Sequence, residues 1–275
     1  MIAALSEVFL GARAEERLTE RLGEAKRLGA EVALLPELPL DPWVPATRTP
    51  RENDAEPPGG PRHEAQSRAA AAAAIGVVGG AIVRDPATGR RHNTALVFDG
   101  RGELAATYRK IHLPQEDGFW EADHYEPGDA PPRVIRGFGL PFGVQICSDS
   151  NRPEGTHILA ALGASAVLAP RATESATFSR WELVFRANAM TSAVWIVSVN
   201  RPGPESGVPL GGPSILVSPD GDVVASTVES LALFHLDEGA VERARRGYPG
   251  YLDTRADVYA DGWRGATSSR SRPPS

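Results

Sequence analysis

The sequence predicts a mixed α/β fold in which two β-sheets pack on each other and helices flank them. Many short apolar runs have the length of strands, and far fewer segments have the 3.6-residue periodicity of a helix. Some of these runs are joined by Gly-, Asp- and Pro-rich turns, which is typical of hairpins, whereas others are separated by helices. Hairpins combined with helix-linked strands indicate mixed sheets, and the excess of strands favours a sheet-on-sheet core.

In the first part of the chain, Leu18, Leu22, Ala25 and Leu28 fall on one stripe of a helix that Gly29 can end. The run Val32-Ala33-Leu34-Leu35 shows no alternation, as expected for a strand buried on both faces. The expected helices are 14–28 and 65–75, and the expected strands are 2–8, 32–35, 77–84, 93–98 and 104–108.

In the second part, we expect strands near 134 and at 142–146, 166–169, 195–200, 215–217, 223–226 and 231–236. Helices are expected after Pro153, at 176–191 and at 239–246, followed by an irregular tail. Long loops are expected at 41–62, 109–132 and 201–211. Residues 1–265 then form a single domain, and residues 266–275, rich in Ser, Arg and Pro, form a disordered tail.

Composition narrows the class of protein. One cysteine in 275 residues excludes an intramolecular disulfide, and there is no basic, then apolar, secretory signal, so we expect a cytoplasmic protein. No segment is apolar enough to span a membrane, and a net charge of −6 argues against nucleic acid as a partner. Neither metal-ligand spacing nor a dinucleotide fingerprint is present, so no metal and no cofactor are expected.

The only cysteine, Cys147, stands where a predicted strand gives way to a turn and then to a helix beginning at Pro153. A side chain there is held rigidly near backbone N–H groups that can stabilise a developing negative charge. A buried structural thiol is an equally good reading of this stretch alone.

Two other ionisable residues also follow predicted strands, Glu37 after Leu34-Leu35-Pro36 and Lys110 after Tyr108. If these strand ends lie together, a carboxylate can take the thiol proton, the thiolate can attack a carbonyl or nitrile carbon, and an ammonium can stabilise the oxyanion. Taken singly, Glu37 could cap a helix and Lys110 could be solvated.

From residue 1 to about 237 the sequence resembles the nitrilase superfamily of carbon–nitrogen hydrolases. The family's three signatures are Pro-Glu, Tyr-Arg-Lys-x-His, and a Cys between a Gly-x-x-Ile strand and Pro-Glu. They are matched in order by Pro36-Glu37, by Tyr108 to His112 and by Gly143 to Glu154. The 119–128 loop also resembles that of N-carbamoylputrescine amidases.

This resemblance implies a four-layer α-β-β-α sandwich that assembles as a homodimer or a higher even-numbered homo-oligomer. It implies that Glu37 is the general base, that Lys110 stabilises the tetrahedral intermediate and that Cys147 is the nucleophile. Glu121 would support the lysine and the substrate, and the backbone N–H of Ser148 would be a second oxyanion donor. The implied reaction is ping-pong hydrolysis through a thioester, whereas His112 is expected to be a structural hydrogen-bonding residue.

The sequence departs from the family around the substrate. Members that hydrolyse N-carbamoyl amino acids have arginines where this chain has Ser150 and Asn151, which removes an expected carboxylate clamp. Glu-Asn late in the helix before Asn200 is replaced by Thr191-Ser192, so a supporting contact is expected to be missing, and Thr-Gly-Tyr becomes Asp41-Pro42-Trp43. The residues expected to contact substrate are Trp43, Trp120, Tyr125, Ser148, Asn151 and Arg171, with the 201–211 loop beside them.

The substrate's charge is left open by the sequence. Asp117, Glu121, Asp123 and Glu126 favour a cationic tail unless they form a solvated loop, whereas Arg171 and Arg201 favour an acidic substrate. The leading interpretation is a hydrolase of a small linear amide or N-carbamoyl compound. A nitrilase, an acyl transferase of the same family, and an inactive homologue that binds a ligand or partner are the alternatives.

Overall fold

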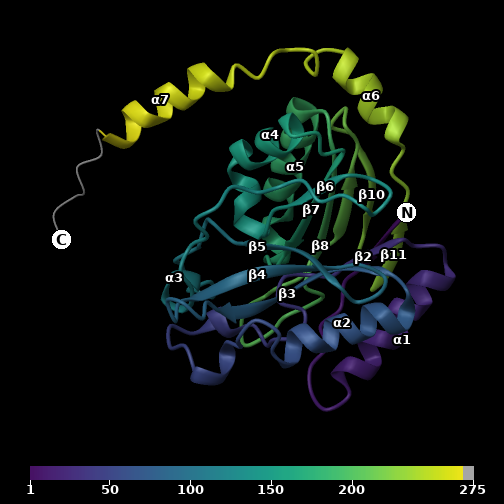
Figure 1. Ribbon diagram of the computed structural model, residues 1–275, viewed down its shortest axis with the longest axis vertical. Coiled ribbons are helices and arrows are strands. Elements are labelled where there is room, and N and C mark those ends of the chain that lie inside the picture. Colours follow the sequence, from purple (N-terminus) through teal and green to yellow (C-terminus); the bar gives the residue numbers. More distant parts are fainter. Residues whose placement is uncertain (269–275) are drawn as a thin grey trace.

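Two β-sheets lie face to face between two layers of helices in the computed structural model, which describes residues 1–268 (Figure 1). This is the α-β-β-α sandwich that the sequence predicts.

The first sheet has the strand order β11-β1-β2-β3-β4-β5. β1, β2 and β3 are parallel neighbours, whereas β4 is antiparallel to β3 and β5 is antiparallel to β4. β5 therefore runs in the same direction as β2, and their carboxyl ends lie at one edge of the sheet. The bounds are β1 Ile2–Leu5, β2 Val32–Leu34, β3 Gly76–Arg84, β4 Arg91–Phe98, β5 Leu104–Arg109 and β11 Leu231–Phe234.

The second sheet has the order β10-β9-β8-β7-β6, in which β6, β7 and β8 are parallel neighbours. The bounds are β6 Phe142–Val144, β7 Ala166–Arg171, β8 Trp195–Asn200, β9 Ser214–Val217 and β10 Val223–Thr227. The predicted hairpin of β9 and β10 is present, and the carboxyl ends of β6, β7 and β8 also share one edge.

Helices α1 (Ala14–Arg27) and α2 (Pro61–Ala73) cover the first sheet, whereas α4 (Pro153–Ala161) and α5 (Phe178–Ser192) cover the second (Figure 1). α3 (Glu121–His124) is a single turn near the ends of β4 and β5, within a segment predicted to be a loop. Short 3-10 helices occur at Val44–Ala46, Glu52–Asp54, Cys147–Asn151 and Ser175–Thr177. None of the described helices is long and apolar enough to cross a membrane.

The alternation of side chains along each strand explains the layers. In β1, Ile2 and Ala4 enter the core between the sheets, whereas Ala3 and Leu5 pack under α1 and α2. β2 is buried on both faces, as its uninterrupted apolar run predicts. β7 likewise sends Leu168 between the sheets, and Val167 toward the core beneath α4 and α5.

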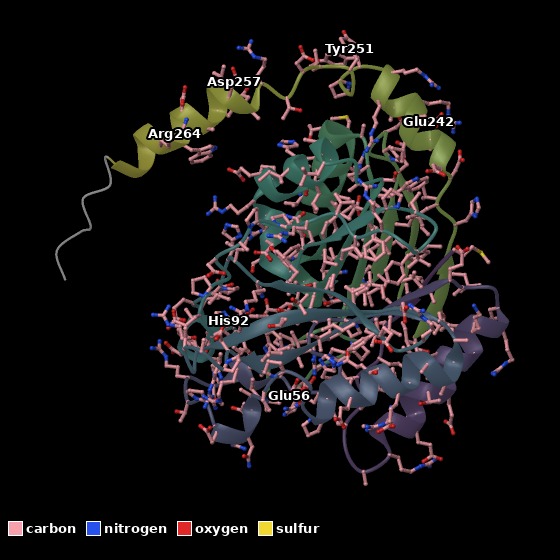
Figure 2. All side chains as sticks on the ribbon, viewed as in Figure 1. Glu56, His92, Glu242, Tyr251, Asp257 and Arg264 are labelled. Atoms are coloured by element: carbon pink, nitrogen blue, oxygen red, sulfur yellow. The ribbon has the colours of Figure 1, made fainter. Side chains whose placement is uncertain are left out.

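The C-terminal region differs from the prediction. After α6 (Glu238–Arg246), an irregular tail was expected, but residues Ala256–Ser268 form helix α7. The predicted tail 266–275 therefore begins within a helix, and residues 269–275 lie outside the described range. Figure 2 shows the segment from Glu242 through Tyr251 and Asp257 to Arg264 extending away from the sandwich. The strand predicted near Val134 is reduced to one bridge between Ile135 and Phe142.

Candidate active site

Three of the predicted catalytic residues follow strands that end at corresponding edges of the two sheets. Glu37 follows β2, Lys110 follows β5 and Cys147 follows β6. The edges of the two sheets meet, since the backbone N–H of Glu37 donates to the carbonyl of Arg171, the last residue of β7, at 3.5 Å. The fold therefore brings together residues that are far apart in the sequence.

The Lys110 ammonium lies between two carboxylates. Its Nζ is 2.7 Å from Glu37 Oε1 and 2.6 and 2.7 Å from the two oxygens of Glu121. All three side chains are fully buried. Because water cannot compete for these charges, their mutual contacts fix the orientation of each group.

Glu37 has one occupied and one unoccupied oxygen. Oε1 accepts from Lys110 and also from Asn93 Nδ2 at 2.7 Å, whereas Oε2 is buried and has no hydrogen-bond partner among the described residues. Oε2 is therefore the oxygen that is available to take up a proton. Asn93 was not predicted to have this role, although a polar residue within the apolar strand β4 was a usable signal.

The turn that carries Glu37 is held from the opposite sheet. Arg201, which follows β8, donates through Nη1 to the carbonyls of Glu37 and Leu38 at 2.9 and 2.8 Å. Its Nη2 donates to the carbonyl of Asp41 at 3.0 Å and to Glu205 Oε2 at 2.6 Å. Leu38 has a left-handed φ of 50°, a conformation that such surrounding contacts can maintain.

Cys147 begins the 3-10 turn after β6 with a φ of 48°, which is unusual for a residue other than glycine. The thiol is unpaired and buried, and Sγ lies 3.6 Å from the carbonyl oxygen of Ala172. Burial raises the pKa of Cys147 well above its ordinary value, Glu37 raises it further and Lys110 opposes the rise. The resting group is therefore a thiol that requires a base before it can attack.

Asp149, two residues after Cys147, links the cysteine turn to the lysine segment. Oδ1 accepts from the backbone N–H groups of Ile111 and His112 at 3.1 and 2.9 Å, and it lies 2.9 Å from His112 Nδ1. Oδ2 accepts from Tyr108 Oη at 2.8 Å and from the N–H of Ile146 at 3.2 Å. Asp149 therefore fixes the strand that carries Lys110 against the turn that carries Cys147, a role that the sequence analysis missed.

The charges are strongly coupled. Burial raises the pKa of Glu121 to about 8, against the opposing effect of Lys110 and with the help of Glu37. Burial lowers the pKa of Lys110, but the two carboxylates more than reverse this and leave it raised. One ammonium faces two buried carboxylates, so the site retains a proton on a carboxyl group to a higher pH than an exposed glutamate would.

Two of the predicted substrate-binding aromatics lie in the apolar cluster beside the site. Trp43 is buried, donates from Nε1 to the carbonyl of Gly118 at 2.9 Å and packs edge-on against Phe119. Tyr125 is also buried, and its hydroxyl has no partner among the described residues. Trp120 is partly exposed and lies under the Arg48 guanidinium, 3.6 Å from the ring centroid.

Arg171 is placed differently from the expectation. Its guanidinium is fully buried and donates to Ser198 Oγ at 2.9 Å, to Thr173 Oγ1 at 2.6 Å and to the carbonyl of Pro213. Desolvation lowers its pKa to about 10. These internal acceptors use the arginine to hold β7, β8 and the segment before β9 together, which does not favour the predicted contact with substrate.

The other two predicted contacts lie in the cysteine turn. Ser148 Oγ donates to the carbonyl of His112 at 2.5 Å, so this side chain ties the turn to the lysine segment, and Asn151 is exposed. Asn188, one turn before Thr191-Ser192 in α5, ties this helix to the cysteine turn, because its Nδ2 donates to the Ser150 carbonyl at 2.7 Å.

The acidic loop is divided between two environments. Glu121 is bound to Lys110, whereas Asp117, Asp123 and Glu126 are exposed to solvent. The solvated-loop interpretation therefore describes these three residues better than a binding site for a cation.

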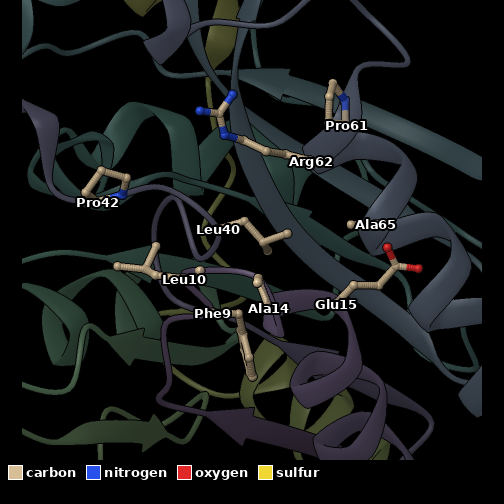
Figure 3. A pocket seen from close by; sticks show the side chains of 11 residues that line it. Phe9, Leu10, Ala14, Glu15, Leu40, Pro42, Pro61, Arg62 and Ala65 are labelled. Atoms are coloured by element: carbon tan, nitrogen blue, oxygen red, sulfur yellow. The ribbon is translucent and has the colours of Figure 1, made fainter.

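Two hollows lie away from the catalytic residues. The first, of about 430 Å³, is lined by Phe9, Glu15, Leu40 and Arg62, among others, from the α1 and α2 side of the first sheet (Figure 3). The second, of about 590 Å³, lies between β5 and the 129–136 segment. Neither contains Glu37, Lys110 or Cys147, so neither hollow is the site predicted around these three buried residues. No group of three or more metal-ligating side chains is found within residues 1–268.

Comparison with known proteins adds independent evidence. The carbon–nitrogen hydrolase family model matches residues 12–246. A hydrolase of Schizosaccharomyces pombe is 33% identical over 86% of this chain and 76% of its own length. A human omega-amidase is 30% identical over 86% and 87% of the two chains, and a Solanum tuberosum N-carbamoylputrescine amidase is 28% identical over 67% and 68%.

The fold has a close counterpart among solved structures. The crystal structure of a carbon–nitrogen hydrolase from Helicobacter pylori superposes with a TM-score of 0.86 at 24% identity, and covers 95% of this chain and 97% of its own. At that identity, the match confirms the arrangement of the two sheets and four covering helices.

Proposed function

The chain belongs to the carbon–nitrogen hydrolase family, and from this premise we propose that it cleaves the amide or N-carbamoyl bond of a small linear substrate through a thioester on Cys147. The observation that carries the proposal is the buried Lys110 ammonium bound by Glu37 and Glu121. Glu37 keeps one oxygen without a hydrogen-bond partner among the described residues, and the charges of Glu37 and Lys110 both act on the buried Cys147 thiol. The similarity to an omega-amidase and to an N-carbamoylputrescine amidase favours amide or carbamoyl substrates over nitriles.

In the proposed reaction, Glu37 Oε2 takes the Cys147 proton and the thiolate sulfur attacks the carbonyl carbon of the substrate. The Lys110 ammonium and the Ser148 N–H stabilise the oxyanion, and Glu121 holds the ammonium in place. The C–N bond breaks as Glu37 returns the proton to the leaving nitrogen, which departs as ammonia or an amine. Glu37 then removes a proton from water, which attacks the thioester and releases the acid and the thiol.

The test uses the fact that Cys147 is the only cysteine of the chain. We expect intact mass spectrometry after rapid acid quenching to show an acyl adduct with amide substrates, together with ammonia release. Cys147→Ala should show neither. Ammonia release by Cys147→Ala at the wild-type rate would refute the mechanism, and acid formed from a nitrile but not from the matching amide would favour a nitrilase. Transfer of the acyl group to added hydroxylamine faster than to water would favour an acyl transferase.

We further propose a cytoplasmic homodimer. The outer faces of α4 and α5 expose Ile158, Leu162, Leu183 and Met190, and an apolar surface of this kind on two adjacent helices suits a self-complementary interface. A reducing compartment would preserve the single nucleophilic thiol. Sedimentation should show a dimer that Leu183→Glu dissociates, whereas Leu28→Glu, at an exposed leucine beside the helices of the first sheet, should have no effect. A monomeric wild type would refute the dimer.

A further inference from the structure

The site has an apolar wall that begins next to the reacting groups. The wall is a buried cluster that includes Leu38, which follows Glu37, and Ala172, whose carbonyl oxygen is 3.6 Å from Cys147 Sγ. The wall is thus the apolar surface that lies next to the sulfur, and we take it as the side on which the acyl chain of a substrate lies. The cluster consists of Leu38, Trp43, Ile82, Phe119, Tyr125, Ala172, Val208 and Leu210.

One polar atom of this wall lacks a partner. The Trp43 indole N–H is satisfied by Gly118, but the Tyr125 hydroxyl has no acceptor among the described residues, although the side chain is only 5% exposed. A buried hydroxyl without a hydrogen bond costs about 1–3 kcal/mol, so such an atom marks the place of an absent partner. Burial and the nearby charges of Glu121 and Asp41 raise its pKa well above the ordinary value, so the hydroxyl stays protonated and can donate.

Among the described residues, the buried cations around this wall are already bound within the protein, whereas Arg48, stacked on Trp120, is exposed to solvent. Arg171 donates to three internal acceptors, and Arg201 to three backbone carbonyls and Glu205. Lys110 is bound by two carboxylates. The positions at which the carbamoylase pattern has arginines are occupied here by Ser150 and Asn151.

An anion for a cationic substrate tail is also absent in the part of the chain that is described. Besides Glu37 and Glu121, the acids whose charges act on Tyr125 are Asp41 and Asp54. Asp41 is fully buried with Oδ1 2.5 Å from Arg62 Nε, an ion pair in which neither carboxylate oxygen accepts a hydrogen bond, and Asp54 accepts from the Arg51 N–H. The remaining loop acids Asp117, Asp123 and Glu126 face solvent. A charged substrate tail would therefore be buried without a counter-ion, which is strongly unfavourable.

We propose that the enzyme selects small uncharged amides whose acyl chain carries a hydrogen-bond acceptor, and that the Tyr125 hydroxyl donates to this acceptor. This inference rests on the proposed amidase function and adds the class of substrate. The apolar wall accommodates the chain, and Tyr125 distinguishes a polar neutral chain from a hydrocarbon chain of the same length.

The experiment compares four amides of similar length: 4-oxopentanamide, which has a neutral acceptor, pentanamide, which has none, succinamate, which is anionic, and 4-aminobutanamide, which is cationic. We expect wild-type kcat/KM for 4-oxopentanamide to exceed that of both charged amides at least about tenfold. Tyr125→Phe should reduce the preference for 4-oxopentanamide over pentanamide by about three- to tenfold, the value of one neutral hydrogen bond. Tyr251→Phe, at an exposed position, should leave that preference unchanged.

A higher kcat/KM for either charged amide would overturn the substrate class while leaving the amidase function intact. An equal loss on both neutral amides in Tyr125→Phe would show that the hydroxyl has only a structural role. Absence of both ammonia release and a Cys147 adduct with all four amides would instead overturn the proposed function itself, and this inference with it.

Discussion

Substituting Asp149 tests whether one buried carboxylate holds the two halves of the active site together. In Asp149→Asn, one oxygen becomes an NH₂ group, which cannot accept hydrogen bonds. The side with fewer donors is Oδ2, so the contacts that are lost are those from Tyr108 Oη and from the Ile146 N–H. Hydrogen bonds to a charged acceptor contribute about 1.5–3 kcal/mol each, and the Tyr108 hydroxyl can rotate to accept from the new amide. We therefore expect the free energy of unfolding to fall by about 2–4 kcal/mol.

The same substitution should reduce kcat by about 100-fold, because a displacement on the order of 1 Å of Lys110 relative to Cys147 is sufficient for such a loss. Urea-induced unfolding followed by circular dichroism measures the first effect, and ammonia release at saturating substrate measures the second. Asp220→Asn is the matched control, since Asp220 is exposed and its side chain makes no hydrogen bond in the described structure. An Asp149→Asn enzyme within about 0.5 kcal/mol and twofold of wild type would refute the role assigned to Asp149.

Two further predictions concern the charges of the site. Because burial raises the folded-state pKa of Glu121 from its usual value near 4.5 to about 8, the folded protein retains a proton that the unfolded chain releases, and stability must decrease as pH rises between these values. The Tm of wild type should therefore fall relative to that of Glu121→Gln, whose amide does not titrate, from pH 5 to pH 8, and a constant difference would contradict the assignment. Arg201→Lys should lose most of the contacts to the Glu37 turn, because an ammonium cannot reproduce the planar fork of the guanidinium, and should lower kcat about tenfold with a smaller change in KM. Arg243→Lys, at an exposed ion pair, provides the control, and equal activity of the two variants would exclude a positioning role for Arg201.

The sequence predicts the layers of this fold well because the pattern of apolar residues in each strand indicates which faces of the strand are buried. The uninterrupted apolar run at β2 and the hairpin turn between β9 and β10 depend on local chemistry, and the structure contains both. Helix α7 was missed because its 13 residues include two glycines, which lower helix propensity, and because its large apolar side chains Val258, Tyr259 and Trp263 are exposed, so that no packing against the core stabilises it.

The strand ends indicate that Glu37, Lys110 and Cys147 could meet, and their catalytic roles come from the resemblance to the family. The structure brings Lys110 into contact with Glu37 and with Glu121. The residues that contact substrate were harder to predict from the sequence, for a physical reason. Arg201 donates mostly to backbone carbonyls, and Arg171 to two hydroxyls and one backbone carbonyl. Every residue carries a backbone carbonyl, and no sequence pattern identifies which one an arginine will meet. An arginine near the site can therefore hold the fold together and need not bind substrate. Only the three-dimensional arrangement of its acceptors distinguishes these two roles.

The division of the reacting groups between the two sheets has a consequence for inactivation. Glu37 and Lys110 are carried by the first sheet and Cys147 by the second, so catalysis depends on how the sheets are docked and not only on whether each is folded. A small slippage of one sheet across the other would separate base and nucleophile while every helix and strand persisted. Heating should accordingly abolish turnover at a lower temperature than it abolishes the far-ultraviolet circular dichroism signal. An acyl group bound to Cys147 should narrow that temperature interval by adding contacts between the two sheets.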